Sequence, residues 1–586
     1  MTFLQRIEQA AASPGLRLQV RRSCILLLFA IAASPALLVA ILNQRDLSSD
    51  QILVVVAASS FALAFHAALF VHFPRIALLT LLAITVLAIP QVWFTSRYGW
   101  PLDPNALSLI AETNIAEASD LVGSISSSTF LILLVPILLA VLAWPPRPGT
   151  KPPPSKPTRR IVALSAIGLI STAASATWSG TLGSPPVPDP TFPPPPTGQA
   201  LALRAAYPAS LPILAWDYAA ERRALHHAAQ LASDYRFGAT PSRARNKRRI
   251  YVVVIGETAR ADHFGINGYP RETTPKLALK NDVISFTRLY SRWTFTRLSV
   301  PVIVSRKPPE STQATFHEAS IVTAFKEAGF RTYWISLQAP VGYHESPTSV
   351  HAKEADRTFF LNPVDYRSQG SHDDAALPVL EDLINQDSNS DLFIVVHTLG
   401  SHFRYSDRYP RDFAKFIPDR TTRPLRLFEA ADKEYLVNSY DNSILFTDHV
   451  LSETIDLLHK LPEIESWIFY VSDHGEALFD DCRQNSGHGQ ASKATQSVAA
   501  LFWPSRSFAL ENPHLVANLT LNRGRLASTS MIFETLASLG GLKIPNPRAD
   551  NDLTNATLRV PTEIADVERL DAQACLALEE SEPFIP

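Results

Sequence analysis

Two apolar segments of this chain end in side chains that bind metal ions. Residues 251–256 read Tyr-Val-Val-Val-Ile-Gly and lead into Glu257, and residues 467–472 lead into Asp473 and His474. Carboxylate and imidazole groups in combination suit Zn²⁺ or Mn²⁺. If Asp473 and His474 stood alone, a structural salt link between them would explain the pair. Because Glu257 occupies the same position after a second segment, a shared metal site is the better interpretation.

Three histidines follow related patterns. His397 ends another apolar segment, 391–397, His402 follows it in His-Thr-Leu-Gly-Ser-His, and His488 stands in Ser-Gly-His-Gly. Binding residues are concentrated in loops that a rigid scaffold positions. We therefore expect His402 and His488 beside the metal site, whereas His397 either joins them or simply closes its strand.

These side chains need a fold that brings distant segments together. From about residue 248 onward, apolar segments rich in β-branched residues alternate with helical patterns. The alternation predicts an α/β domain with a doubly wound, mostly parallel sheet and helices on both faces. Ligands bind such sheets beyond the carboxyl ends of the strands, where the candidate ligands fall. The predicted strands are 250–256, 331–336, 391–397, 467–472 and 498–503.

The first third of the chain is expected to form a membrane domain. Five apolar runs are each near the length that crosses a hydrocarbon core as a helix. Lys and Arg gather before the first run and between the fourth and fifth runs. This predicts a cytoplasmic N-terminus and places the chain after the fifth run outside, in the periplasm of a Gram-negative cell. The runs are 23–43, 52–72, 75–95, 128–146 and 160–182.

The chain is therefore expected to have three parts. Residues 1–183 form the five-span transmembrane domain, and residues 248–586 form the α/β domain. Residues 184–247 connect them through a stiff Pro-rich spacer, 185–196, and a helix at about 209–234.

Charge and cysteine content exclude several function classes. The formal net charge of −2 gives no sign of a nucleic-acid partner. The basic stretch 242–249 is either a solvated linker or a contact with anionic lipid. The three cysteines exclude a disulfide framework, and only Cys482 and Cys575 could pair. No GxGxxG or GxxxxGK(S/T) loop is present, so a nucleotide site is not expected.

Five longer motifs follow one another along the chain. They are Gly-Glu-Thr-Ala-Arg-Ala-Asp-His-Phe (256–264), Asn-Gly-Tyr (267–269), Arg-Glu-Thr-Thr-Pro (271–275), Tyr-Asp-Asn (440–442) and Ser-Asp-His-Gly-Glu (472–476). In this order they resemble the phosphoethanolamine transferases of Gram-negative bacteria, which are inner-membrane enzymes of the alkaline phosphatase and sulfatase superfamily. That family includes lipid A-modifying and colistin-resistance enzymes. The resemblance spans nearly the whole chain and implies a zinc enzyme with a sulfatase-like domain.

The resemblance also implies a nucleophile. The family uses a zinc-ligating threonine five residues before the proline of a Ser-Val-Pro element, which is Thr296 here. A threonine hydroxyl becomes a good nucleophile only beside a metal or a base. Thr294 and Thr258 are rivals, since the first lies two residues away and the second adjoins Glu257.

The remaining site residues follow from the same resemblance. His402 and His488 are assigned to the phosphoryl and head-group side, where they could bind a second zinc, stabilise charge or protonate a leaving oxygen. Gln338 either lines the acceptor side or lies in a surface turn. The implied zinc ligands are Glu257, Thr296, Asp473 and His474.

The implied reaction is a two-step transfer. Thr296 attacks phosphatidylethanolamine, diacylglycerol leaves, and a phosphoethanolamine-threonine intermediate passes its group to a lipopolysaccharide acceptor. The enzyme is expected to act as a monomer. Lipid A-type members carry cysteines on both sides of the nucleophile, and residues 292–302 lack both. The acceptor therefore stays open between lipid A, a core sugar, a periplasmic glucan and another envelope glycan.

Three other functions fit the sequence less well. A sulfatase needs Cys or Ser in the pattern Cys/Ser-x-Pro-x-Arg, and Ser299-Val-Pro-Val-Ile303 lacks the arginine. A glycerol-phosphate transferase of the lipoteichoic acid type shares the implied fold but not the Glu-Thr-Ala-Arg-Ala-Asp motif. A transporter or sensor with a decayed enzyme domain would have lost ligands, and its spans would carry more ionisable residues than His66.

Overall fold

The computed structural model describes most of the chain in two compact units, whose boundary falls between Ala224 and Leu225. The described residues are 14–42, 48–98, 101, 102, 104, 107, 127–144, 199–311, 313, 316–338, 347–362, 370–419, 430–480, 486–489 and 491–569.

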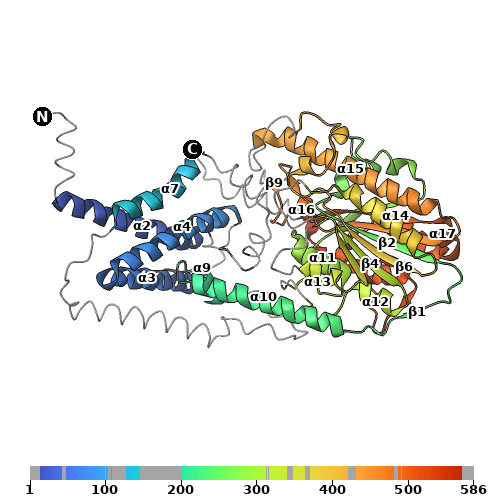
Figure 1. The fold of residues 1–586 in the computed structure, drawn as a ribbon, viewed down its shortest axis with the longest axis horizontal. Coiled ribbons are helices and arrows are strands. Elements are labelled where there is room, and N and C mark those ends of the chain that lie inside the picture. Colours follow the sequence, from blue (N-terminus) through green and yellow to red (C-terminus); the bar gives the residue numbers. More distant parts are fainter. Residues whose placement is uncertain are drawn as a thin grey trace. The chain divides into compact units, whose positions relative to one another are not determined.

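The first unit is helical (Figure 1). Small side chains pack in its interior, among them Ala32 and Ala140, while large apolar side chains such as Leu26 and Leu53 face outward. This arrangement is typical of helices that meet lipid rather than water. The helices are α2 (Pro14–Leu42), α3 (Ser49–His72), α4 (Pro74–Tyr98), α7 (Ser127–Leu142), α9 (Gln199–Ala205) and the first part of α10 (Leu211–Asp234).

Three of the five predicted spans are confirmed as helices long and apolar enough to cross a membrane. They are Leu18–Leu38, Ser49–Phe70 and Pro74–Val92. The fourth run is helical in α7, which has 16 residues. The fifth run, 160–182, lies outside the described residues, as do the Pro-rich spacer and both Cys482 and Cys575.

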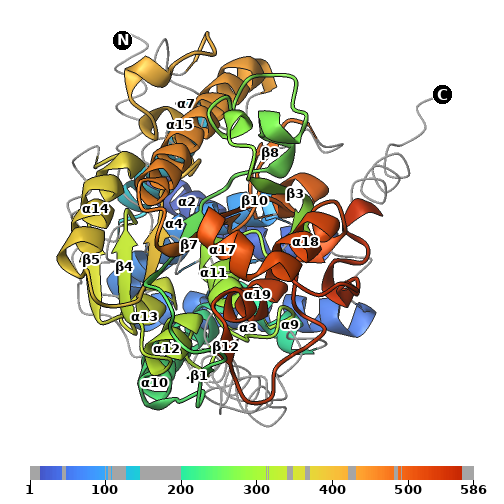
Figure 2. The same ribbon diagram turned by 90° about the vertical axis from the view of Figure 1, so that its right-hand side faces the viewer.

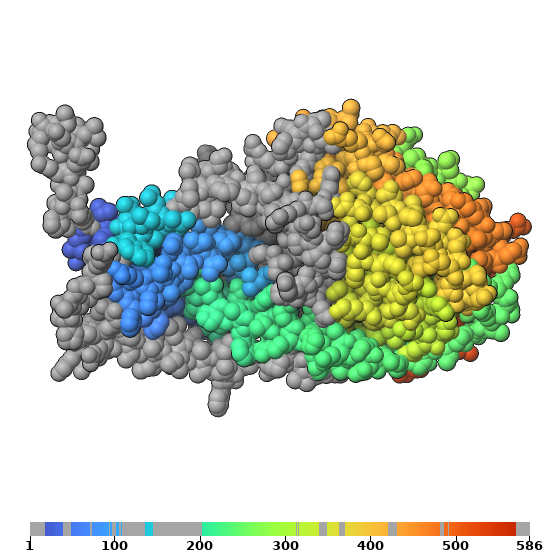
Figure 3. Space-filling model, viewed as in Figure 1, coloured from blue at the N-terminus to red at the C-terminus, as the bar shows by residue number. Residues whose placement is uncertain are grey.

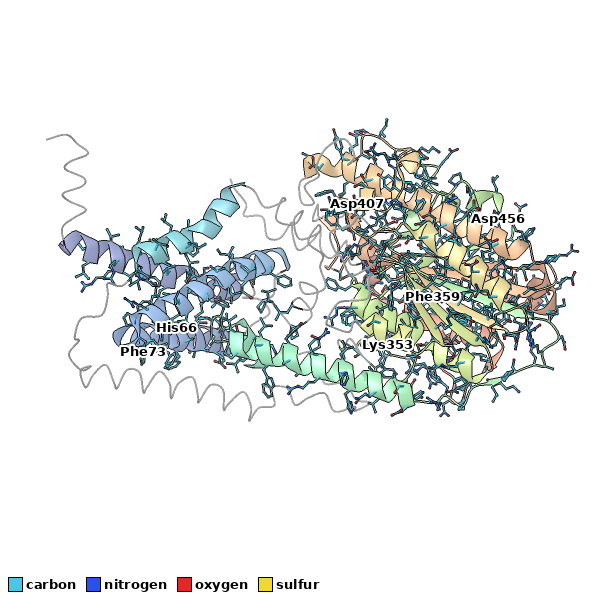
Figure 4. All side chains as sticks on the ribbon, viewed as in Figure 1. His66, Phe73, Lys353, Phe359, Asp407 and Asp456 are labelled. Atoms are coloured by element: carbon cyan, nitrogen blue, oxygen red, sulfur yellow. The ribbon has the colours of Figure 1, made fainter. Side chains whose placement is uncertain are left out.

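His66 has a structural explanation. Its Nε2 lies 3.2 Å from Thr80 Oγ1, so it links α3 to α4 (Figure 4). A polar side chain in a membrane helix is stabilised when a neighbouring helix supplies a hydrogen-bond partner. This contact gives His66 a structural role between the two helices.

The second unit is built on an eight-stranded sheet of order β11-β3-β10-β7-β2-β6-β4-β5. All five predicted strands are present, and three short or partly exposed strands were not predicted. The predicted strands are β2 (Arg249–Gly256), β4 (Arg331–Ser336), β6 (Leu392–His397), β7 (Glu465–Ser472) and β10 (Ser497–Pro504). The additional strands are β3 (Ile284–Tyr290), β5 (Arg357–Phe360) and β11 (Ala527–Ser528).

The sheet is mixed, although most neighbouring strands are parallel as predicted. β10 pairs antiparallel with both β3 and β7, and the other neighbouring strands of the sheet pair in parallel. The sequence of 498–503 could not show its direction, because a buried antiparallel strand has the same continuous apolar composition as a parallel one.

Helices cover both faces of the sheet (Figures 1 and 2). In β2, Tyr251, Val253 and Ile255 belong to one core cluster, and Ile250 and the other alternate residues belong to the second. This is the period of two that a strand imposes. α12 (Ile321–Glu327), α17 (Arg506–Glu511), α18 (Pro513–Asn522) and α19 (Ile532–Leu539) pack in the first cluster, and α14 (Ala376–Gln386) and α15 (Lys433–His459) in the second. Figure 3 shows the surface over α14 in yellow and over α15 in orange.

The remaining elements are short. They are α11 (Thr296–Val304), α13 (Pro347–Ala352), α16 (Lys493–Gln496), the paired β1 (Thr240–Pro241) and β12 (Leu542–Lys543), and the paired β8 (Ala477–Leu478) and β9 (Ser486–Gly487).

The basic stretch 242–249 is largely exposed, but each of its Arg and Lys side chains forms an ion pair or a hydrogen bond within the protein. Arg249 forms a buried two-point ion pair with Asp391, with N···O distances of 2.8 and 2.6 Å. Arg243 pairs with Glu465, and Arg248 donates to three backbone carbonyls of residues 384–390. Arg245 also reaches Asp391. The stretch therefore fastens the chain to the amino-terminal edge of the sheet.

Candidate metal centre and nucleophile

Strand register brings the candidate residues to one edge of the sheet. β7, β2, β6 and β4 are parallel neighbours, with Gly256 beside Ser472 and with His397 beside both Ile255 and Ser336. Residues that follow these positions leave the sheet at the same edge. Glu257, which follows β2, and Asp473, which follows β7, therefore lie together.

Glu257, Asp473 and His474 form a fully buried cluster. Their side chains have no exposed surface. His474 Nε2 lies 3.2 Å from Glu257 Oε1 and 3.5 Å from Asp473 Oδ2, and one ligand atom from each residue lies within 4.8 Å of the others. Two carboxylates and one imidazole converge on a small volume, which is the donor set that a divalent transition metal prefers.

The electrostatics of the cluster also fit a cation. Burial and the charge of Glu257 raise the pKa of Asp473 to about 7. Burial alone would lower the pKa of His474, but the Asp473 and Glu257 carboxylates raise it to about 10. Among the described residues, Asp473 Oδ2 accepts no hydrogen bond, and His474 Nε2 lies near both carboxylates without making a well-directed hydrogen bond to either. Buried polar atoms of this kind call for a partner, and a metal ion would supply it.

Thr296 is the first residue of α11 and points at this cluster. Its Oγ1 lies 3.2 Å from Glu257 Oε1 and 3.1 Å from Oε2. The side chain is half-buried, so a substrate can reach it. A helix N-terminus also favours negative charge, because its first amides point outward.

The other candidate hydroxyl groups are placed less favourably for attack on a substrate. Thr258 is fully buried, and its Oγ1 donates to Glu257 Oε1 over 2.8 Å. Thr294 is buried beside α11. Ser299 lies within α11, is fully buried, and donates to the carbonyl of Trp293.

Gln338 lies at the cluster rather than in a surface turn. Its Nε2 donates to Glu257 Oε2 over 3.2 Å and to the Thr398 carbonyl over 3.1 Å. The side chain is half-buried. Gln338 thus holds the oxygen of Glu257 opposite to the one bound by Thr258.

His488 and His402 both approach the cluster. The His488 ring centre is 4.6 Å from that of His474, and its Nδ1 lies 2.9 Å from Glu476 Oε2. The other oxygen of Glu476 accepts a hydrogen bond of 2.5 Å from the Tyr405 hydroxyl. His474, Glu476 and His488 form a second group that could hold a metal ion. His402 follows Ser401, whose N–H donates to the Glu257 carbonyl over 2.9 Å. Burial would raise the pKa of Glu257, but His474 and, to a smaller extent, His402 lower it.

His397 closes its strand. It is buried, and neither ring nitrogen has a hydrogen-bond partner among the described residues. Burial lowers its pKa to about 4, so the ring is neutral. It packs edge-on against Trp334, with ring centres 6.2 Å apart.

Sequence reasoning missed Asp373. This buried carboxylate accepts the backbone N–H groups of Leu399 and Gly400 over 2.7 and 2.8 Å. Gly400 has a φ of +49°, and a Cβ there would lie 2.8 Å from the Glu257 carbonyl oxygen. Asp373 therefore holds the loop that lies against Glu257. The glycine was the only local signal, because nothing near Asp373 in the sequence marks it.

Several motif residues build a polar network instead of the cluster. Buried Asp441 binds His263 Nδ1 and accepts from Tyr269 and Arg271, at 2.8, 2.9 and 2.8 Å. None of these contacts involves a candidate ligand. The network fixes α15 against the segment that follows β2.

Comparison with known protein families agrees with this arrangement. A family model described as Sulfatase matches residues 249–541, which is half of the 586 residues. The chain belongs to the sulfatase family. A second model, described as Phosphoethanolamine transferase EptA/EptB, matches residues 58–182. The two matches together confirm the resemblance predicted from the motifs.

Individual relatives point to the same group. Phosphoethanolamine transferase EptA of Escherichia coli O157:H7 is 30% identical over 324 residues, which cover 54% of this chain and 57% of that protein. Kdo(2)-lipid A phosphoethanolamine 7''-transferase of Escherichia coli strain K12 is 32% identical over 271 residues, or 45% of this chain and 46% of that protein. The chain thus spans about half the length of the curated relatives it matches.

A solved structure shows the same fold. It is the integral membrane protein lipooligosaccharide phosphoethanolamine transferase A from Neisseria meningitidis, which matches with a TM-score of 0.65 and 19% identity. The match covers 92% of this chain and 99% of the other.

Proposed function

We propose that the protein transfers phosphoethanolamine from phosphatidylethanolamine to a lipopolysaccharide acceptor, lipid A or a core sugar, at the periplasmic face of the inner membrane. One observation carries the proposal. An accessible hydroxyl, Thr296 Oγ1, stands at a helix N-terminus within 3.2 Å of the Glu257 carboxylate in a cluster suited to a metal. The curated relatives bear the names of phosphoethanolamine transferases.

The residues present fit a zinc ion. Asp473 Oδ2 and His474 Nε2, which make no directed hydrogen bond among the described residues, would hold it together with Glu257 and Thr296. When bound there, zinc would lower the pKa of the Thr296 hydroxyl and offset negative charge on the phosphoryl oxygens. Oxygen and imidazole donors of this type are ordinary zinc ligands.

The first half of the reaction forms a covalent bond to Thr296. Oγ1 attacks the phosphorus of phosphatidylethanolamine, and the bond from phosphorus to the diacylglycerol oxygen breaks. The hydroxyl proton passes to Glu257, to which Oγ1 donates. The departing diacylglycerol oxygen takes a proton from His488 or His402, which border the cluster.

The second half returns Thr296 to its starting state. An acceptor oxygen loses its proton to one of the same histidines and attacks phosphorus, the bond to Thr296 Oγ1 breaks, and Oγ1 takes its proton back from Glu257. Glu476 holds His488 Nδ1, which directs Nε2 away from Glu476 and fixes the tautomer. The same imidazole can therefore give a proton in one half and take one in the other.

The apolar helices of the first unit support a membrane location. Three are long enough to cross a bilayer, which would hold the enzyme at the surface that contains its donor lipid. The periplasmic side is inferred from the distribution of Lys and Arg.

Mass spectrometry of lipopolysaccharide tests the proposal. Cells that produce the wild-type chain should add a phosphoethanolamine-sized mass to lipid A or to the core, and cells that produce Thr296→Ala should not. The same mass on a periplasmic glucan would keep the chemistry and change the acceptor. Equal modification by Thr296→Ala would contradict the assigned nucleophile.

A further inference from the structure

Thr258 has a backbone conformation that threonine rarely adopts. Its φ is +62°, in the left-handed region. A β-branched side chain is strained there, whereas glycine and asparagine are tolerated. Strained residues of this kind persist where the surroundings fix them, and they gather at functional sites.

One residue supplies hydrogen bonds to both carboxylates of the metal cluster. Thr258 Oγ1 donates to Glu257 Oε1 over 2.8 Å, and its backbone N–H donates to Asp473 Oδ1 over 3.0 Å. The two carboxylates follow different strands, β2 and β7. Thr258 therefore ties together ligands that come from separate parts of the sheet.

The hydrogen bonds to Asp473 also decide which of its two oxygens faces the metal position. Asp473 Oδ1 accepts from Thr258 and from the backbone N–H of His474, at 3.0 and 2.7 Å. This leaves Oδ2 as the oxygen without a hydrogen-bond partner among the described residues. The orientation of the carboxylate is thus set before any ion binds.

Neighbouring groups hold the strained turn in place. The Tyr440 hydroxyl donates to the Thr258 carbonyl over 2.8 Å and accepts from the Arg260 N–H over 2.9 Å. The N–H of Ala259 donates to Ser472 Oγ over 2.7 Å. The conformation of Thr258 is therefore enforced by β7 and α15.

We infer that Thr258 is a positioning residue of the metal centre, whose hydroxyl orients Glu257 while its left-handed backbone orients Asp473. The inference rests on the proposed function, since it concerns the same zinc site. Residues that hold metal ligands typically change metal affinity by 10–100-fold when they are altered.

The test uses the purified full-length chain in detergent, stripped of metal and titrated with Zn²⁺ alone. Thr258→Val keeps the shape and the branched Cβ but removes the hydroxyl. Thr258→Ser keeps the hydroxyl. Thr258→Gly removes the hydroxyl and the backbone strain together. Thr454→Val is the matched control, because its buried hydroxyl donates to its own helix at the Val450 carbonyl.

Zinc affinity should follow the hydroxyl and not the stability of the fold. Thr258→Val and Thr258→Gly should bind zinc roughly 10–100-fold more weakly. Thr258→Ser and Thr454→Val should bind within about threefold of wild type. The Tm of each metal-free variant, measured in parallel, should not rank the variants in the same order as their zinc affinities.

Two results would overturn the inference. Wild-type affinity in Thr258→Val would show that the hydroxyl does not position Glu257. A loss of affinity in Thr258→Ser as large as in Thr258→Val, with a matching fall in Tm, would show a purely structural role. If wild type itself binds no zinc, the proposed zinc centre fails as well, which separates the two failures.

Discussion

Glu257 shows how much of this site depends on single side chains. Its two oxygens meet hydroxyl groups of Thr258 and Thr296 and the amide of Gln338, three residues from different parts of the chain. Glu257 itself could be predicted because it ends an apolar strand. The family resemblance implied Thr296 beside Glu257, but the hydrogen bonds from Thr258 and Gln338 could not be predicted, since they depend on backbone angles and on loops whose paths the sequence does not specify.

His488 and His402 provide a test at this scale. Replacing either by Ala should slow transfer by roughly 10²–10⁴-fold, because a positioned general acid and base is lost. Zinc bound with Glu257 should remain. The measurements are the turnover rate with phosphatidylethanolamine and the zinc content of each variant. Replacement of exposed His514 on α18 is the control. An unchanged rate in His488→Ala would show that His488 takes no part in the reaction.

Among the strands and loops, some features could be predicted from the sequence and others could not. Five strands followed from continuous apolar segments, but the antiparallel direction of β10 did not, because a buried strand has the same composition in either direction. The basic stretch 242–249 looked available for lipid, yet its charges pair with acidic and carbonyl groups from distant segments. Such pairing cannot be seen in a linear sequence.

The Arg249–Asp391 pair should stabilise the amino-terminal edge of the sheet. Asp391→Ala would leave a buried guanidinium without its partner, which lowers the free energy of unfolding by roughly 3–5 kcal/mol. The fall should appear as a lower Tm. Glu453→Gln breaks a pair with Lys276 between half-exposed side chains and should change the free energy by less than about 1 kcal/mol. Equal Tm values for the two variants would contradict the assignment.

The loop before His402 should respond to pH through Asp373. Burial raises the pKa of Asp373 to about 6, above its ordinary value of 3.8. The folded state therefore holds this proton more tightly than the unfolded state, so its contribution to stability is lost as pH rises from about 4 through 6. Wild type should lose more Tm between pH 4.5 and 7 than Asp373→Asn does. A parallel pH dependence in the two proteins would show that Asp373 does not titrate there.

At the scale of the whole molecule, a membrane unit and an enzyme unit occur in one chain. The apolar runs predicted a membrane unit, and three of them are confirmed as helices long and apolar enough to cross a membrane. The fold of the second unit followed from alternating strands and helices. The acceptor could not be predicted, because it depends on surfaces that the motifs do not include.

The membrane unit should be needed to reach the donor lipid. A chain restricted to residues 225–586 should still bind zinc through the same ligands. Its transfer from phosphatidylethanolamine in vesicles should fall by at least about tenfold, because the donor is no longer held near the site. Rates from vesicles, compared with the full chain in the same vesicles, measure this. Equal rates would show that anchoring is unnecessary.

The most direct test of the central claim is peptide mass spectrometry of the full chain after incubation with zinc and phosphatidylethanolamine but no acceptor. The account predicts a phosphoethanolamine-sized adduct on Thr296, absent in Thr296→Ala and removed when an acceptor is added. An adduct on Thr258, Thr294 or another residue, or active transfer with no adduct at all, would contradict it.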